Sequence, residues 1–348
     1  MDRIEDLVRP NIQALCPYST ARDEYKGALG VFLDANESPY PSGWNRYPDP
    51  RQSLLRARLA AIKGVSVDNL FLGNGSDEAI DLMFRIFCEP GLDNAVAIAP
   101  SYGMYKVSAA INNVEMREVP LGPDWSLPVE GLLPACDDRT KLMFLCSPNN
   151  PTGNAFPRAQ MLELLDSFGG IVVVDEAYID FSAVPSMVDE IAARPNLVVL
   201  QTCSKARGLA ALRLGLALSN PFIINLMMMV KYPYNISDAT QRLALEALDR
   251  PVDVQVAEIV EQRSRLAAAL PRFASVRKVW PSEANFLLVK VDDADALYAH
   301  LIADGIIVRN RNRVRGCEGC LRITVGLPVE NDKLLESLRD YEKGDIRR

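Results

Sequence analysis

The stretch Thr202-Cys203-Ser204-Lys205-Ala206-Arg207-Gly208-Leu209, with Arg213 shortly after it, lies between two apolar runs. The run before it, residues 197–200, predicts a buried parallel strand, and residues 212–218 form the second run. Burial of an ammonium group costs free energy and lowers its pKa, which suits a lysine that forms Schiff bases. Hydroxyls and an arginine beside that amine would suit a phosphate. The stretch therefore indicates either a lysine that binds pyridoxal phosphate or an ordinary surface-loop lysine, and the rest of the chain must decide.

Composition narrows the class of protein. The chain has 348 residues, of which 49% are hydrophobic and 24% charged, as expected for a globular enzyme with one large and one smaller domain. Its net charge of -7 argues against nucleic acid as the main partner, with the arginine-rich residues 309–315 as a local exception. We expect a cytoplasmic protein without membrane contact, because the seven cysteines are scattered and neither a signal peptide nor a membrane span is evident.

The single histidine, His300, excludes several kinds of site. It lies in an amphipathic pattern at residues 294–303, away from every motif. A histidine-based catalytic triad or a multi-histidine zinc site would have to depend on this residue alone. The cysteine pair Cys317 and Cys320 is weak evidence for zinc, and either coincidence or a redox-sensitive pair remains open. We therefore expect no metal.

Alternating patterns predict an α/β protein. Strands are expected at residues 31–34, 69–72, 95–99, 114–119, 141–146, 171–174 and 197–200, and helices at 51–63, 76–87, 102–112, 157–167 and 222–230. A helical zone at 237–270, interrupted near 250–251, leads to strands at 276–279, 285–291, 306–308 and 321–324 and to helices at 294–303 and 328–341. Polar motifs follow several central strands, at the edge where parallel sheets place their sites.

A glycine turn at residues 73–78 opens the helix predicted from residue 76. A helix N-terminus offers unpaired amides and a positive dipole to a phosphate. The turn lacks the lysine of a Walker loop and the full glycine spacing of a dinucleotide-binding loop. By itself the turn is weak evidence for a phosphate site, and a helix N-cap formed by Ser76 or Asp77 explains it better.

Taken together, the motifs resemble one family of enzymes. The motifs are Gly75-Ser76-Asp77-Glu78, Pro100-Ser101-Tyr102-Gly103-Met104-Tyr105, residues 147–153, Asp175-Glu176-Ala177-Tyr178, Ser204-Lys205 with Arg213, and Leu321-Arg322-Ile323-Thr324-Val325-Gly326. This set is similar to that of fold-type I aminotransferases that use pyridoxal 5'-phosphate. Pro17-Tyr18, residues 34–39 and Asn45-Arg46-Tyr47-Pro48-Asp49-Pro50 resemble, within them, the histidinol-phosphate aminotransferases.

The resemblance implies a fold and a domain organisation. It implies an α/β, fold-type I structure whose large domain has a mostly parallel seven-stranded sheet between helices, with a smaller α+β domain. On this basis, residues 1–42 form a segment that packs with the small domain and the active site. Residues 43–245 form the large, cofactor-binding domain and residues 246–348 the small domain.

The resemblance also assigns the cofactor site. Lys205 would bind the cofactor and transfer the substrate proton, Asp175 would keep the pyridine nitrogen protonated, and Tyr178 with Asn150 would hold the phenolate oxygen. Tyr102 would stack on the ring. The phosphate would be bound by Ser76, Asp77, Thr202, Ser204 and Arg213. Without the resemblance, Asp175 could be a strand-end cap and residues 149–151 only a turn.

Substrate binding and assembly are implied in the same way. Arg322 would bind the substrate's phosphate or carboxylate, Arg309 would help with the phosphate, and Tyr18 and Asn36 would close the pocket. The substrates would be histidinol phosphate with 2-oxoglutarate, which becomes glutamate. A tyrosine matching Tyr47 reaches the neighbour's phosphate in dimers of this family, so a homodimer with shared active sites is expected.

Other functions stay open on the sequence alone. A broad-specificity aromatic aminotransferase would accept phenylalanine as donor, and a phosphothreonine decarboxylase on the same scaffold would not consume 2-oxoglutarate. A cofactor-binding regulatory module without turnover could dispense with Lys205. The complete set of polar motifs disfavours this last alternative.

Overall fold

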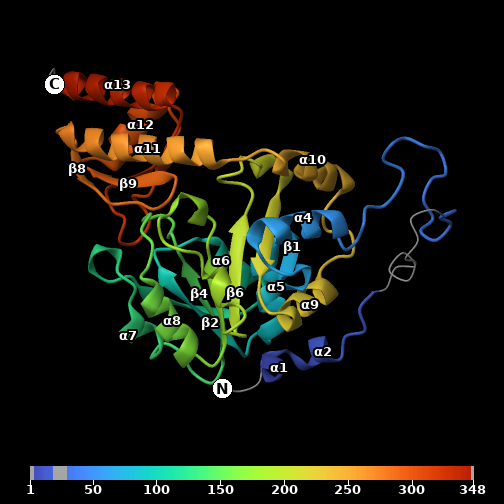
Figure 1. Ribbon diagram of the computed structural model, residues 1–348. Helices are drawn as coiled ribbons and strands as arrows, with labels where there is room; N and C mark the ends of the chain where they lie inside the picture. Colours follow the sequence, from blue (N-terminus) through green and yellow to red (C-terminus); the bar gives the residue numbers. More distant parts are fainter. Residues whose placement is uncertain (1–3, 19–29, 346–348) are drawn as a thin grey trace.

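The computed structural model describes residues 4–18 and 30–345, which form two layered units around two sheets (Figure 1). The larger sheet has seven strands in the order β1-β7-β6-β5-β4-β2-β3. β7 runs antiparallel to both of its neighbours, and the other strand pairs are parallel. The predicted mostly parallel α/β sheet is therefore confirmed.

The elements have the following bounds. The large sheet consists of β1 (Leu70–Asn74), β2 (Asn94–Ala99), β3 (Glu115–Pro120), β4 (Thr140–Cys146), β5 (Ile171–Asp175), β6 (Leu197–Thr202) and β7 (Leu214–Leu218). The helices before and around it are α1 (Ile4–Leu7), α2 (Pro10–Gln13), α4 (Ser53–Lys63), α5 (Ser76–Phe87), α6 (Met104–Ile111), α7 (Val129–Leu132), α8 (Arg158–Ser167), α9 (Pro221–Val230) and α10 (Asp238–Leu248). The smaller unit has α11 (Asp253–Ala269), β8 (Val276–Val279), β9 (Phe286–Val291), α12 (Ala294–Ala303), β10 (Arg309–Asn310), β11 (Cys320–Thr324) and α13 (Pro328–Asp345).

The central strands are apolar along their whole length because both faces of the sheet are covered. In β5, Val172 and Val174 belong to one hydrophobic core, whereas Ile171 and Val173 belong to the other. Side chains alternate between the faces of a strand, so a continuous β-branched run fills both cores at once. This pattern rigidly places the polar residue Asp175, which ends the strand.

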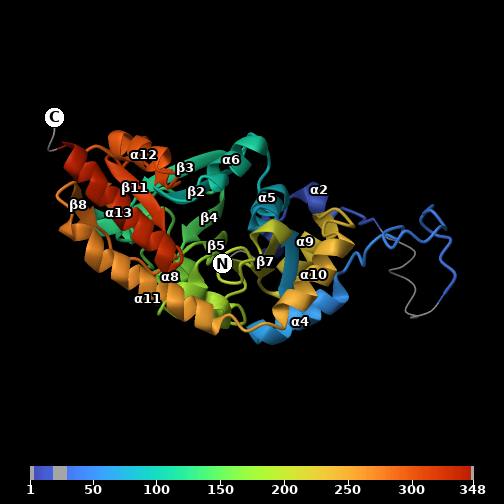
Figure 2. The same cartoon turned by 90° about the horizontal axis from the view of Figure 1, so that it is seen from above.

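Helices form a layer on each face of the large sheet (Figures 1 and 2). α5, α6 and α9 contribute Ile80, Tyr105 and Ile223 to one core. α4 and α8 contribute Leu59 and Leu164 to the core of the opposite face. Burial of each such aliphatic side chain contributes about 1.5–3 kcal/mol.

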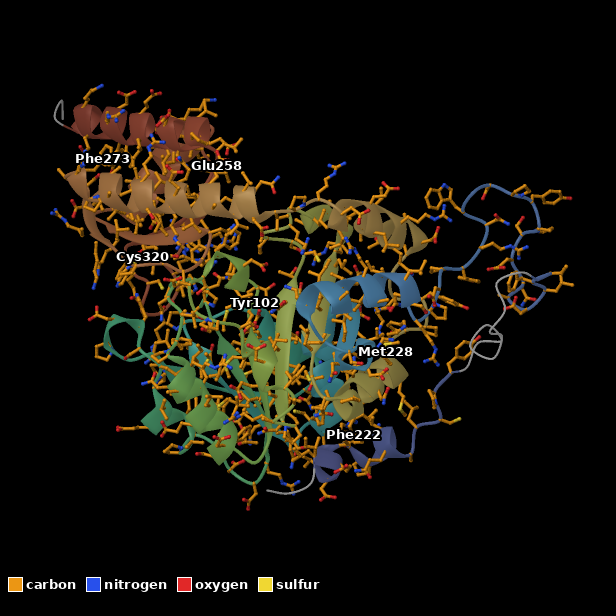
Figure 3. The ribbon with its side chains drawn as sticks, in the orientation of Figure 1. Tyr102, Phe222, Met228, Glu258, Phe273 and Cys320 are labelled. Carbon is orange, nitrogen blue, oxygen red and sulfur yellow. The ribbon has the colours of Figure 1, made fainter. Side chains whose placement is uncertain are left out.

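The smaller unit is an antiparallel sheet covered by helices. Its strand order is β10-β11-β9-β8, and α11, α12 and α13 share one apolar core with it. Figure 3 places Phe273 and Cys320 in this unit, whereas Tyr102 lies near the centre of the molecule. The interruption predicted near 250–251 separates α10 from α11. The domain boundaries given above remain predictions.

Two predicted strands are wrong. Residues 31–34 form no strand. They lie on a segment that extends from the body of the molecule (Figure 1), where Val31 and Leu33 are 87% and 88% exposed. The strand predicted at 306–308 begins only at Arg309. The amide of Ile306 donates to the Leu301 carbonyl at the end of α12, 2.7 Å away, and is therefore not available to a sheet.

Within the described residues, no helix is long and apolar enough to cross a bilayer.

Candidate active site

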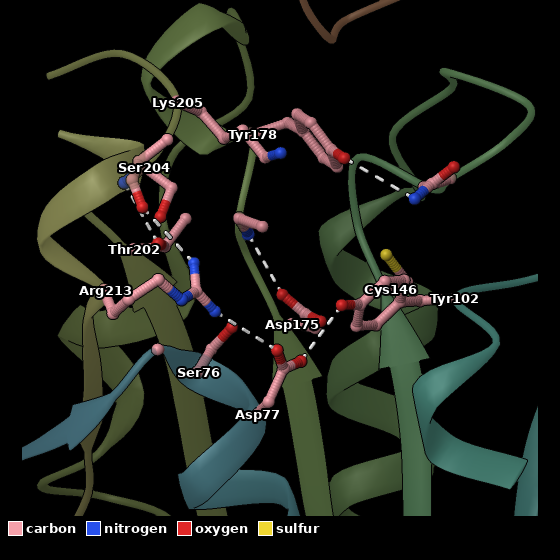
Figure 4. A pocket seen from close by; sticks show the side chains of 14 residues that line it. Ser76, Asp77, Tyr102, Cys146, Asp175, Tyr178, Thr202, Ser204, Lys205 and Arg213 are labelled. Carbon is pink, nitrogen blue, oxygen red and sulfur yellow. Dashed lines mark hydrogen bonds and ion pairs between the residues drawn. The ribbon is translucent and has the colours of Figure 1, made fainter. Parts of the chain in front are cut away.

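A pocket opens at the carboxyl ends of the parallel strands of the large sheet. It is lined by Gly75, Ser76, Asp77, Tyr102, Cys146, Asn150, Asp175, Ala177, Tyr178, Thr202, Ser204, Lys205, Ala210 and Arg213. Every residue that the resemblance assigned to the cofactor, except Tyr47, is in this set. Residues far apart in the sequence meet here because β1, β4, β5 and β6 end at the same edge (Figure 4).

One end of the pocket is formed by the N-terminus of α5. Gly75 precedes the helix with φ of 79°, a conformation that other residues rarely adopt. Gly215 of β7 lies so close that a Cβ atom there would be 2.1 Å from the Ser76 nitrogen. The two glycines therefore place the first amides of α5 against β7. An α-helix of this length presents unpaired amides and a positive dipole to an anion.

Hydroxyl and guanidinium groups complete this end of the pocket. Thr202 ends β6, and its Oγ1 accepts a hydrogen bond from the Ser204 amide at 3.0 Å. Arg213 stands immediately before β7 with φ of 52° and lies 3.5 Å from Asp77 (Figure 4). The Arg213 guanidinium also faces Gly75, where a Cβ would come within 2.6 Å of its Nη2. The arrangement suits a phosphate, which such donors bind well.

The floor of the pocket carries a buried carboxylate. Asp175 is 2% exposed. Its Oδ2 accepts a hydrogen bond from the Tyr105 hydroxyl at 2.7 Å, and its Oδ1 accepts one from the Ala177 amide at 3.1 Å. Burial raises the pKa of Asp175, while these two hydrogen bonds act in the opposite direction. The carboxylate is thus desolvated and held at both oxygens.

A loop after β4 supplies the opposite wall. Asn150 donates to the Tyr178 hydroxyl over 3.5 Å, and its Oδ1 accepts from Arg322 at 2.5 Å. The neighbouring Asn149 is fully buried and fastens the loop by donating to the Pro100 carbonyl and to Thr152 Oγ1. Burial raises the pKa of Tyr178, so its hydroxyl stays protonated and can donate to an anionic oxygen.

Lys205 reaches the mouth of the pocket. Its amine lies 5.6 Å from the centre of the Tyr178 ring (Figure 4). The side chain retains solvent contact, although protein surrounds much of it. Desolvation lowers the pKa of Lys205, and the positive charges of Arg322 and Arg213 lower it further. A larger neutral fraction makes this amine a better nucleophile and base.

These residues fit pyridoxal phosphate. The group needs an anion site for its phosphate, a carboxylate for its pyridine nitrogen, hydrogen-bond donors for its phenolate oxygen and a lysine for its aldehyde. The pocket offers all four kinds of group, and Asp175, buried among apolar strands, is otherwise costly to retain. Within the described residues, no group of three or more His, Cys, Asp or Glu side chains could hold a metal ion.

Arginines of the smaller unit gather beside Asn150. Arg309 of β10 pairs directly with Arg322 of β11, so the two side chains share one face of the ladder. Alternation puts Arg311 on the same face. The Nε atoms of Arg311 and Arg322 are buried without a hydrogen-bond partner among the described residues. Burial and the charges of Arg322 and Arg309 lower the pKa of Arg311 to about 10. These three cationic side chains thus lie close together beside the pocket, and they could bind an anionic group of the substrate.

Besides the two arginines Arg309 and Arg322, which lie beside the pocket, the predicted residues Tyr47, Asn36 and Tyr18 lie in other hollows of this single chain. Tyr47 is half exposed and stacks on Tyr234 with ring centres 4.5 Å apart. With Asn36 it lines a separate surface hollow. Tyr18 is 75% exposed and lies in another hollow, near Lys231. Their roles stay predictions.

The cysteine pair does not contribute to the pocket. Cys317 and Cys320 are free, buried thiols that pack with Leu288. Burial raises the pKa of Cys317 to about 12, which makes it a poor nucleophile at neutral pH.

Sequence reasoning missed some residues of the site. It gave no role to Tyr105, Asn149 or Arg311. The alternating arginines of residues 309–315 were the available signal for Arg311. Tyr105 lies three residues after Tyr102 within the same motif, but no sequence pattern reveals its contact with Asp175.

The sheet topology and this pocket define the class: an α/β enzyme of fold type I built for a lysine-bound cofactor. A family model, "Aminotransferase class I and II", matches residues 31–338. The chain belongs to this family, whose members use pyridoxal phosphate, and the predicted resemblance is confirmed. It is an aminotransferase.

Relatives of known name agree with this assignment. The chain is 54% identical to a histidinol-phosphate aminotransferase of Parabacteroides distasonis, over 98% of this chain and 100% of that protein. It is 51% identical to one of Bacteroides thetaiotaomicron, with the same coverage. A crystal structure of histidinol-phosphate aminotransferase from Sinorhizobium meliloti in complex with pyridoxal-5'-phosphate superimposes with a TM-score of 0.78 at 26% identity. This superposition covers 88% of this chain and 90% of that one.

Proposed function

We propose that this enzyme transfers the amino group of L-histidinol phosphate to 2-oxoglutarate, giving imidazole acetol phosphate and glutamate in histidine biosynthesis. The observation that carries the proposal is the arginine pair Arg309 and Arg322, directly opposite each other on β10 and β11. Arg322 reaches Asn150 at the pocket wall. A phosphate-bearing donor and a dicarboxylate acceptor both need cations at this point. The full-length likeness to named relatives supports the same choice.

Each pocket residue has a distinct task in this reaction. Arg213, Ser204, Thr202 and the first amides of α5 would bind the cofactor's phosphate. Asp175 would accept a hydrogen bond from the pyridine nitrogen and keep it protonated. Asn150 and Tyr178 would donate to the phenolate oxygen, and Tyr102 would cover the ring. Bound pyridoxal phosphate supplies an electron sink that stabilises negative charge at the substrate α-carbon.

Lys205 moves the proton. The Nζ of Lys205 would hold the cofactor at rest and would be free to act as a base once the substrate amine is bound. The lowered pKa of Lys205 favours the neutral amine, which would remove the proton from the substrate α-carbon as a general base and later donate it as a general acid. The second half-reaction uses the same groups in reverse, which gives ping-pong kinetics.

Assembly and location form part of the proposal. We infer a homodimer in which the segment at residues 30–48 of one subunit covers the pocket of the other. Val31, Leu33, Tyr40, Trp44 and Tyr47 of this segment are exposed, and several large apolar side chains exposed on one short segment favour an interface. We place the enzyme in the cytoplasm, where free cysteines such as the exposed Cys16 stay reduced.

The test is a single-turnover experiment with the cofactor-loaded enzyme and no keto acid. Histidinol phosphate, phenylalanine and phosphothreonine are added separately, and the cofactor's visible absorption band is followed. Rapid loss of the band is expected with histidinol phosphate, because only this donor offers both an imidazole and a phosphate. Equal conversion with phenylalanine would instead indicate a broad aromatic aminotransferase. Release of carbon dioxide from phosphothreonine would indicate a decarboxylase.

A matched variant tests the phosphate contact. Arg309→Gln removes one cation, and a charge-assisted hydrogen bond of about 1.5–3 kcal/mol corresponds to roughly a 10- to 100-fold loss. The half-saturating concentration of histidinol phosphate should rise by this factor, while that of phenylalanine changes little. A parallel loss for both donors would contradict the assigned role.

A further inference from the structure

Tyr105 is a buried tyrosine beneath the pocket. It lies in the first turn of α6 and is 2% exposed. Its ring stacks on Phe144 of β4 at 4.8 Å and meets the edge of Tyr102 at 5.6 Å. Tyr102 lines the pocket and Tyr105 does not. The ring of Tyr105 is thus held in one position by its neighbours, one layer below the cofactor site.

The hydroxyl of Tyr105 interacts with the Asp175 carboxylate and also lies beside the Cys146 thiol. It donates to Asp175 Oδ2 at 2.7 Å, while the other carboxylate oxygen accepts from the Ala177 amide. A hydrogen bond to the ionised form favours a carboxylate, whereas burial opposes it. In an interior of low dielectric constant, such a donor has a large effect because water cannot replace it.

We propose that Tyr105 is a positioning residue of the cofactor site: its hydroxyl orients Asp175 and keeps it ionised, so that the proton shared with the cofactor's pyridine nitrogen stays on the nitrogen. This inference rests on the proposed role of Asp175 and adds a residue that does not touch the cofactor.

The direction of the effect follows from the shared proton. Without the Tyr105 hydroxyl, the Asp175 oxygen becomes more basic and draws the proton toward itself. The pyridine ring would then carry less positive charge. The nitrogen that links the cofactor to Lys205 would therefore hold its proton more tightly, which means that its pKa would rise. The pH at which the visible absorption band changes should therefore rise.

Other groups face Asp175 and must be considered in such a titration. They are Asp77 of α5, Tyr102 before α6, Cys146 of β4, Tyr178 after β5 and Lys205 after β6. Burial raises the pKa of Tyr105 well above its ordinary value, so Tyr105 remains a donor at every pH of the experiment.

The first measurement compares the holoenzyme with its Tyr105→Phe variant, which keeps the ring and its stacking. We expect the midpoint of the absorption titration to rise by roughly half a pH unit to one unit, and the dissociation constant of pyridoxal phosphate to rise roughly tenfold. Tyr298→Phe, a change on α12 far from the pocket, serves as the matched control and should leave both quantities unchanged. An unaltered midpoint in Tyr105→Phe overturns the proposal.

A second variant guards against a folding defect. Site-specific incorporation of 3,5-difluorotyrosine at position 105 keeps the phenol and makes it a stronger donor. The titration midpoint should then move in the opposite direction, to lower pH. A shift in the same direction as that of Tyr105→Phe would indicate a packing effect and refute the role of the hydrogen bond.

A double-mutant cycle with Asp175→Asn, recorded in excess cofactor, separates the two assignments. Asp175→Asn alone should weaken cofactor binding, and Tyr105→Phe should add little in that background. If Asp175→Asn has no effect, the proposed role of Asp175 fails, and the Tyr105 proposal fails with it. If Asp175→Asn weakens binding but Tyr105→Phe shifts the midpoint equally in both backgrounds, only the Tyr105 proposal fails.

Discussion

At the scale of single residues, Asp175 combines a functional benefit with a cost in stability. It ends an apolar strand and lies between two hydrophobic cores, where a charged group is poorly solvated. Its two hydrogen bonds offset part of that cost. A protein selected for stability alone would not keep a carboxylate here, because active sites commonly trade stability for function.

Replacement of Asp175 by Asn should therefore stabilise the cofactor-free protein. Folding raises the pKa of Asp175 above its unfolded value of about 3.9, so the folded chain binds its proton more tightly than the unfolded chain. The free energy of unfolding then falls as pH rises through the interval between the two pKa values. At pH 7 the cofactor-free variant should be more stable by on the order of 1 kcal/mol. Denaturant unfolding at several pH values measures this difference.

The pH series contains its own control. Below the unfolded pKa the wild-type carboxyl is protonated in both states, and the advantage of the variant should vanish there. A difference that is the same at pH 3.5 and pH 7 would show that Asn acts through packing and not through charge.

Residues of the pocket were predictable where they follow an apolar strand in the sequence. Asp175, Asn150 and Lys205 are of this kind, since an apolar run predicts where the strand ends and which edge it reaches. Tyr105 and Arg311 were not predictable in this way. Tyr105 reaches Asp175 across the interface of α6 with the sheet, and Arg311 depends on the register of β10.

At the scale of elements, the junction of β1, α5 and β7 positions the anion site. β1 delivers the chain to Gly75, and β7 passes so close to the start of α5 that only a glycine fits at position 215. The backbone amide of Gly75 also donates to the Arg213 carbonyl at 2.6 Å. The close approach of the α5 and β7 backbones therefore brings the N-terminus of α5 next to the hydroxyl groups and the Arg213 guanidinium of the anion site.

Gly215→Ala should disturb this junction. The new Cβ would lie 2.1 Å from the Ser76 nitrogen and 2.2 Å from the Gly75 carbonyl carbon, both of which are backbone atoms that cannot rotate away. We expect a loss of stability of about 1–3 kcal/mol and at least a roughly tenfold weaker affinity for pyridoxal phosphate. Thermal unfolding and cofactor titration check the two effects separately.

Gly169→Ala provides the matched control, since a Cβ there meets nothing within 4 Å. It should leave cofactor affinity unchanged. If the two variants bind the cofactor equally well, the close approach at Gly215 is not what positions the anion site.

Elements were predicted well where both hydrophobic pattern and end signals agreed. Asp49 and Pro50 indicated a helix start near residue 51, and α4 begins at Ser53. The pattern at 31–34 failed because a short apolar run becomes a strand only beside a partner strand. The strand predicted at 306–308 failed because the Ile306 amide donates to the Leu301 carbonyl at the end of α12. This amide is therefore not available to pair with a neighbouring strand.

At the scale of the whole molecule, the chain on its own holds the cofactor residues but not every predicted residue of the site. The segment at residues 30–48 extends from the body (Figure 1) and carries Tyr47. Glu37 gives this segment internal order, because its carboxylate accepts from the Tyr47 amide and pairs with Arg46, each at 2.6 Å. An ordered, apolar extension is suited to dock on a second copy of the chain.

Mixed dimers test the shared site. Tyr47→Ala and Lys205→Ala are each expected to lose activity, one through the contact to the partner's phosphate site and the other through the proton-transfer amine. In a dimer of one subunit of each kind, one site has its own Lys205 together with the intact Tyr47 of the other chain. The second site lacks both. The mixed dimer therefore keeps one working site in two, and it should show roughly half of the wild-type activity per dimer. Co-expression with two affinity tags, followed by activity measurement of the doubly selected dimer, provides the result. Activity no higher than the sum of the two pure variants would mean that Tyr47 acts within its own chain, or not at all, and the shared site would have to be abandoned.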